Sequence, residues 1–178
     1  MKTTEPYEVL AEILRYPGED FPSRLARCRE TLGPEGEAAA ALATFADCLA
    51  PLSAAEREEL YIRAFDMNPA GALEIGWHLF GETYDRGAFL VKMREALRRY
   101  GLPESSELPD HLIHVLPILG RMEKAAADSF ADACVLPALE KIVAALEKKS
   151  NPYEYALGAV RSFVKSRHEG FAEGLANG

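Results

Sequence analysis

The sequence has few cysteines and no long apolar run. Its three cysteines, Cys28, Cys48 and Cys134, are odd in number and far apart, so no disulfide framework is expected and a reducing compartment is indicated. No run reaches the ~18 apolar residues that a membrane span requires. The opening "MKTTEPYEVL" has no apolar core of a signal peptide. We therefore expect a cytoplasmic protein without stable membrane insertion.

Positive charge is also scarce. The chain has 20 lysines and arginines against 28 aspartates and glutamates, which gives a net charge of −8. Nucleic-acid binding needs a basic footprint, and docking on an anionic membrane needs basic clusters, so neither is expected. The negative field favours a basic partner instead, such as an arginine-bearing peptide.

Catalytic motifs are missing as well. The sequence contains no HExxH, no GxSxG, no phosphate-binding GxxxxGK[ST] and no GxGxxG. We therefore expect neither an enzyme nor a bound cofactor. Two alternatives stay open. The first is a metal-dependent helical hydrolase, which would use His78, Asp110, His111 and His114, and the second is a helical scaffold for some other partner.

Strand signals are lacking, whereas helix signals are abundant. Apolar residues recur at helical spacing along a chain rich in alanine, leucine and glutamate. The pattern predicts an all-α, single-domain bundle of roughly eight helices over residues 1–178, with about the last eight residues frayed.

Several helix boundaries can be read locally. Thr4 and Asn151 are expected to cap helices, and "SAAE" at 53–56 is a capping box. We expect a short helix over 71–80 and a longer one over 85–100. Asp85 is expected to cap the longer helix. Pro117 is expected to bend or break its helix, and Pro137 marks a weak point in a later one.

Two segments are unusual. The first, "EIGWHLFGETYDRGAFLVKM" at 74–93, combines aromatic side chains with three glycines, and the second is "ELPDHL" at 107–112. Close packing and a recognition surface explain the aromatics equally well. Asp110 is expected in a first helical turn, where a carboxylate offsets the positive helix end. His111 lies off the leucine face of that helix, so it should point into a groove or at solvent.

These segments, together with "ILRYP" at 13–17, "LYIRAFDMNPAGAL" at 60–73 and "NPYEYAL" at 151–157, resemble the respiratory nitrate reductase delta-subunit family. The family comprises the NarJ-type molybdenum-cofactor assembly chaperones within the TorD/DmsD-like group. The resemblance implies an all-helical cytoplasmic chaperone without catalytic activity. Such a protein binds the apo catalytic subunit of a molybdopterin oxidoreductase, often at its N-terminal leader, until the molybdenum cofactor is inserted. Membrane docking of the enzyme follows.

The resemblance and the residue types together give a set of expected client-binding residues. They are Trp77, His78, Glu82, Tyr84, Arg86, Glu107, Pro109, Asp110, His111 and Leu116. Asp110, with Glu107 or Glu82, is expected to pair with client arginines.

The other members of this set have different expected roles. Trp77, Tyr84 and Leu116 should form an apolar wall, and Arg86 should tie the two segments together. Both segments should then lie on one face and share a cavity. The protein is expected to act as a monomer or dimer.

Overall fold

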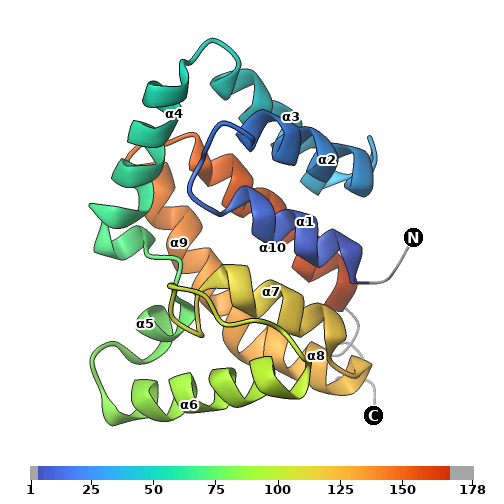
Figure 1. Ribbon diagram of the computed structural model, residues 1–178, viewed down its shortest axis with the longest axis vertical. Helices are drawn as coiled ribbons and strands as arrows, with labels where there is room; N and C mark the ends of the chain where they lie inside the picture. The colour runs from blue at the N-terminus through green and yellow to red at the C-terminus, as the bar shows by residue number, and fades with distance from the viewer. Residues whose placement is uncertain (1–3, 169–178) are drawn as a thin grey trace.

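A computed structural model of the chain describes residues 4–168, and within this range the protein is all-helical with no strand (Figure 1). The predicted all-α class is confirmed. The helices are α1 (Glu5–Ile13), α2 (Phe21–Leu32), α3 (Glu37–Leu49), α4 (Ala54–Tyr61), α5 (Ile75–Phe80), α6 (Tyr84–Arg99), α7 (Leu112–Arg121), α8 (Lys124–Phe130), α9 (Leu136–Lys148) and α10 (Tyr153–His168). The expected fraying concerns residues outside the described range.

The helices pack around an apolar core, and α10 lies at its centre. It packs against α3 and α9, while α1 packs against α2 and α7. Tyr153, at the start of α10, is fully buried, and its ring lies 5.0–5.6 Å from the rings of Phe45, Tyr61 and Phe65. This aromatic cluster joins the helices α3, α4 and α10. No helix in the described range is long and apolar enough to cross a bilayer.

The helix caps follow the sequence in part. Ser53 and Glu56 form the predicted capping box, and Asn151 accepts a hydrogen bond from the Tyr153 amide over 2.9 Å. Two expected caps are wrong. Thr4 has helical backbone angles and makes no side-chain cap bond. Helix α6 begins at Tyr84, so Thr83 caps it in place of Asp85.

Neither Pro117 nor Pro137 interrupts the helical segment in which it lies. Pro117 sits inside α7, which continues to Arg121, so the helix is not broken there. Pro137 stands in the first turn of α9, directly after a π-helical turn over Ala131–Val135. The wider turn gives room for the proline ring, whose carbons would otherwise meet the carbonyl four residues earlier. Residues 124–148 therefore run on as helix without a break.

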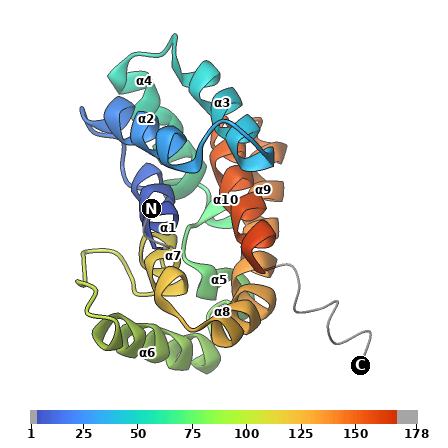
Figure 2. The ribbon, with the colours of Figure 1, turned by 90° about the vertical axis from the view of Figure 1, so that its right-hand side faces the viewer.

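Helices α5 and α6 occupy the end of the molecule opposite α4 (Figures 1 and 2), and α6 lies across this end in both views. The predicted helix over 71–80 starts only at Ile75. Pro69–Gly71 form a 3₁₀ turn, and Glu74 is extended because it makes an isolated antiparallel bridge with His111. The long connection between α6 and α7 thus returns to the start of α5 and brings the two unusual segments together.

Candidate functional site

The segments 74–93 and 107–112 are joined by backbone hydrogen bonds. The Ile75 amide donates to the Asp110 carbonyl, and the Leu112 amide donates to the Leu73 carbonyl, each over 3.0 Å. The two segments therefore form one continuous unit, as the sequence predicts.

The carboxylate of Asp110 is the buried centre of this unit. Its side chain has no exposed surface, its Oδ2 accepts a hydrogen bond from the Gly76 amide over 3.0 Å, and Oδ2 lies 3.7 Å from Nη2 of Arg86. Burial raises the pKa of Asp110, and the Arg86 guanidinium opposes this rise. Asp110 precedes α7 and does not lie in its first turn, so it stabilises the positive end of α5 instead.

Arg86 connects the two segments, as expected. Besides its ion pair with Asp110, its guanidinium lies 5.7 Å from the centre of the Trp77 ring. The Trp77 indole donates to the Pro69 carbonyl over 3.1 Å. The His78 Nε2–H donates to the Ala72 carbonyl over 2.6 Å, and burial lowers the pKa of His78. Trp77 and His78 therefore hold α5 against the segment that precedes it.

The predicted residues differ in how they can meet a partner. Glu82, Tyr84 and Glu107 are exposed, and Tyr84 is 99% exposed. Asp110 and Leu116 have no exposed surface, and Pro109 is buried. The expected exposed wall at Leu116 is wrong, because this side chain is part of the core. A direct contact of Asp110 with a client arginine is not available in this conformation.

His111 lies at the start of α7 and is 4% exposed. Its Nδ1 accepts a hydrogen bond from the Ile113 amide over 3.1 Å, so the proton of the neutral ring is on Nε2. Burial lowers the pKa of His111 to about 3, so the ring is neutral. The side chain lines a small cavity and does not face open solvent, which agrees with the first of its two expected positions.

This cavity has a volume of about 130 Å³ and lies where the two segments meet the end of α4. Seven of the residues that line it are polar or aromatic: Tyr16, Tyr61, Phe65, Asp66, Glu74, Glu107 and His111. Only Glu107 and His111 among them belong to the expected client-binding residues. Tyr16, Tyr61 and Asp66 come from the quoted motifs "ILRYP" and "LYIRAFD", but no local pattern places them beside "ELPDHL".

The cavity beside His111 contains a possible set of metal ligands. Ligand atoms of Glu74, Glu107 and His111 lie within 4.8 Å of one another, and no other such cluster of three occurs in residues 4–168. However, Nδ1 of His111 already accepts a backbone hydrogen bond. A metal on Nε2 would leave the ring without any proton, whereas metal-bound histidines keep one on the other nitrogen. The donor set therefore fits a metal poorly.

The alternative hydrolase site is not assembled either. His114 Nε2 lies 2.9 Å from the Ser105 hydroxyl, and His78 Nε2 donates to the Ala72 carbonyl. Asp110 Oδ2 accepts the Gly76 amide, whereas Asp110 Oδ1 is buried without a hydrogen-bond partner. These groups do not converge with His111 in the described residues.

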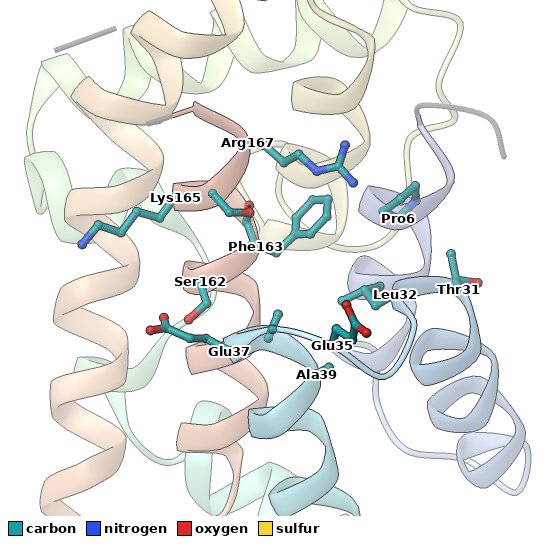
Figure 3. A pocket seen from close by; sticks show the side chains of 13 residues that line it. Pro6, Thr31, Leu32, Glu35, Glu37, Ala39, Ser162, Phe163, Lys165 and Arg167 are labelled. Atoms are coloured by element: carbon teal, nitrogen blue, oxygen red, sulfur yellow. Dashed lines mark hydrogen bonds between the residues drawn. The ribbon is translucent and has the colours of Figure 1, made fainter. Parts of the chain in front are cut away.

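A larger cavity of about 530 Å³ lies between the start of α3 and the end of α10 (Figure 3). The Arg167 guanidinium lies 5.0 Å from the centre of the Phe163 ring at its edge, and Glu35 lines the other side. None of the predicted site residues belongs to it. It therefore carries no part of the candidate site.

The comparisons with known proteins agree with this picture. The nitrate reductase molybdenum cofactor assembly chaperone NarJ of Escherichia coli (strain K12) is 30% identical over 119 residues, which are 66% of this chain and 50% of that protein. The NarJ protein of Escherichia coli O157:H7 matches to the same extent. The chain thus spans about half the length of the curated relatives it matches. Residues 34–157 match the model of the nitrate reductase delta subunit, and the chain belongs to this family.

Proposed function

We propose that this protein is a cytoplasmic assembly chaperone of a nitrate-reductase-like molybdopterin oxidoreductase. It binds the N-terminal segment of the apo catalytic subunit and holds the subunit open for insertion of the molybdenum cofactor. The enzyme docks on its membrane subunit afterwards. Membership of the delta-subunit family supports this proposal, and so does the role of the NarJ relatives as nitrate reductase molybdenum cofactor assembly chaperones.

The observation that carries the proposal is the joined unit of the two motif segments. Asp110 Oδ2 accepts the Gly76 amide and pairs with Arg86. The Trp77 indole donates to the Pro69 carbonyl, so these contacts together fix the backbone of the unit. Glu82, Tyr84 and Glu107 project outward from this fixed backbone. A tyrosine that is 99% exposed contributes nothing to the core, whereas tyrosines are among the residues that dominate binding energy at interfaces.

Charge supports the same partner. The net charge of −8 attracts a basic or arginine-bearing segment at long range, and the exposed carboxylates of Glu82 and Glu107 lie on the unit itself. An apolar side of such a segment would then meet Tyr84 and Leu90, which line a shallow hollow at the start of α6.

The direct test is calorimetric titration of the protein with the N-terminal peptide of the catalytic subunit encoded by the same organism. We expect saturable 1:1 binding that weakens with added salt, and no binding of a scrambled peptide of equal composition. In parallel, an affinity-tagged copy expressed at native level should retain the apo catalytic subunit. If neither the peptide nor the apo subunit binds, the proposal is wrong, and a scaffold for another partner remains.

A further inference from the structure

The small cavity beside His111 carries an unbalanced negative charge. Asp66, Glu74 and Glu107 all line it, and within the described residues none of the three forms an ion pair with a lysine or arginine. Burial raises the pKa of Glu74, and the nearby Asp110 and Glu107 carboxylates add to the rise. The Arg86 guanidinium opposes this rise only in part. The three carboxylates thus line one cavity without a directly paired lysine or arginine in residues 4–168.

Aromatic rings form another wall of this cavity. The Tyr16 and Tyr61 rings lie 5.5 Å apart, edge to face, and the Tyr61 ring lies 4.9 Å from that of Phe65. The Tyr61 hydroxyl donates to the Leu14 carbonyl, so the ring is the part of this residue that faces a guest. Tyr16 is 49% exposed at the mouth. Aromatic faces beside carboxylates attract organic cations.

His111 is a second, independent feature of this cavity. Its side chain is only 5% exposed, and its Nδ1 is occupied by the Ile113 amide. Its Nε2–H lines the cavity and has no hydrogen-bond acceptor within range in the described residues. The nearest carboxylate oxygen, on Glu107, is 3.9 Å away. A cation that drew Glu107 inward would bring this acceptor to the buried donor, and each contact would strengthen the other.

The size of the cavity limits the guest. At about 130 Å³ it holds the volume of roughly four water molecules, each of which takes ~30 Å³ in the liquid. This is enough for the head of one side chain and too little for a nucleotide. A planar guanidinium can bridge two carboxylates and stack on a tyrosine at the same time, which an ammonium cannot do.

We propose that this cavity binds the side chain of one arginine in the N-terminal segment of the client. The inference rests on the proposed function and names the contact that anchors the segment. The surroundings suit an amphipathic peptide, because the large exposed apolar residues Met67 and Leu108 directly follow the cavity residues Asp66 and Glu107 in the chain. The carboxylates of Asp66, Glu74 and Glu107 thus form the binding site for the guanidinium group.

Calorimetry with a double variant, Glu74→Gln with Glu107→Gln, tests the proposal against a control of equal charge change, Glu30→Gln with Glu147→Gln. The control residues are exposed and lie on α2 and α9, away from the cavity. We expect the cavity variant to bind the client peptide at least about tenfold more weakly than wild type, since it loses two charged partners of one guanidinium. The control should differ from wild type by less than about threefold.

A second arm identifies the guest. A peptide with the arginine replaced by neutral, isosteric citrulline should bind wild type about tenfold more weakly but should bind the cavity variant no worse than the arginine peptide does. Equal losses in both proteins would overturn the proposal. So would equal losses in the cavity and control variants. If wild type retains the apo subunit but binds no peptide, the arginine site is overturned alone. If it binds neither, the proposed chaperone function fails as well.

Stability and metal titrations exclude the remaining explanations. Glu74→Gln relieves repulsion between carboxylates, so the cavity variant should unfold at the same or a higher urea concentration than wild type even though it binds more weakly. Weaker binding together with a lower urea midpoint would indicate a structural role and contradict the proposal. Stoichiometric binding of Zn²⁺ or Mn²⁺ that the cavity variant loses would assign the cavity to a metal instead.

Discussion

Gly76 donates its amide hydrogen to the buried carboxylate of Asp110, and the absence of a side chain at Gly76 is what permits this contact. A Cβ atom at this position would lie 2.5 Å from Asp110 Oδ2 and 2.9 Å from the Phe89 ring. The start of α5, the connection to α7 and the inner face of α6 therefore meet at one glycine.

Gly76→Ala should accordingly destabilise the protein by about 1–3 kcal/mol, the usual cost of forcing an extra methyl into a packed interior. Gly87→Ala is the matched control, because a Cβ there meets nothing within 4 Å and Gly87 lies inside α6. It should stabilise the protein by roughly 0.5–1 kcal/mol, since alanine favours the helix. Urea unfolding measures both, and similar effects of the two changes would contradict the close approach at Gly76.

Arg86→Gln should destabilise the protein in a manner that depends on pH. The variant leaves the buried Asp110 carboxylate without its cation, which should cost about 3 kcal/mol at neutral pH, at the lower end for a buried pair because Arg86 is 20% exposed. The folded-state pKa of Asp110 is already raised, and removing Arg86 raises it further. Folding with an ionised Asp110 thus becomes less favourable as pH rises through that pKa.

The difference between wild type and Arg86→Gln should therefore shrink as the pH falls through the raised pKa values of Asp110, where the carboxylate gains its proton, and should grow toward neutral pH. Free energies of unfolding measured by urea titration at several pH values check this. A difference that is constant with pH would show that the cation–π contact with Trp77, and not the ion pair, accounts for the loss.

Ser53→Ala should lower the free energy of unfolding by about 1 kcal/mol, because the Ser53 hydroxyl accepts the Glu56 amide at the start of α4. Thr4→Ala is the control, since the Thr4 side chain makes no cap bond to α1. It should change the free energy by less than ~0.5 kcal/mol. Thermal or urea unfolding separates the two, and a larger loss at Thr4 would contradict the description of α1.

Helix caps show how far local sequence can be trusted. Ser53 was predicted correctly because the capping box is a contact within four residues, and its geometry follows once the helix starts. Thr4 has the right side chain, but its backbone angles of −82° and −24° are helical, so the hydroxyl is not placed to accept a bond. The choice between Asp85 and Thr83 depends on the residue at which α6 begins, which side-chain type alone does not fix.

The sequence predicts which motif residues lie together, but it does not predict which of them are exposed to solvent. The link through Arg86 follows from opposite charges in two recognisable motifs, and the ion pair with Asp110 confirms it. The burial of Asp110 and Leu116 depends on how α5, α6 and α7 pack, which involves residues far apart in the chain. The cavity at His111 likewise gathers residues 16, 61 and 66 around residues 74, 107 and 111, and no periodic pattern links these positions.

Tyr84→Ala should weaken binding of the client peptide by about tenfold or more, the effect of removing a dominant interface residue, while stability changes by less than ~0.5 kcal/mol. Because the side chain is 99% exposed, its removal leaves the core unchanged. Tyr84→Phe should retain most of the affinity if the ring supplies the contact. Val91, half-exposed and two turns further along α6, should show a smaller loss on change to alanine. Calorimetry gives all three values, and unchanged affinity in both alanine variants would place the client away from this face of α6.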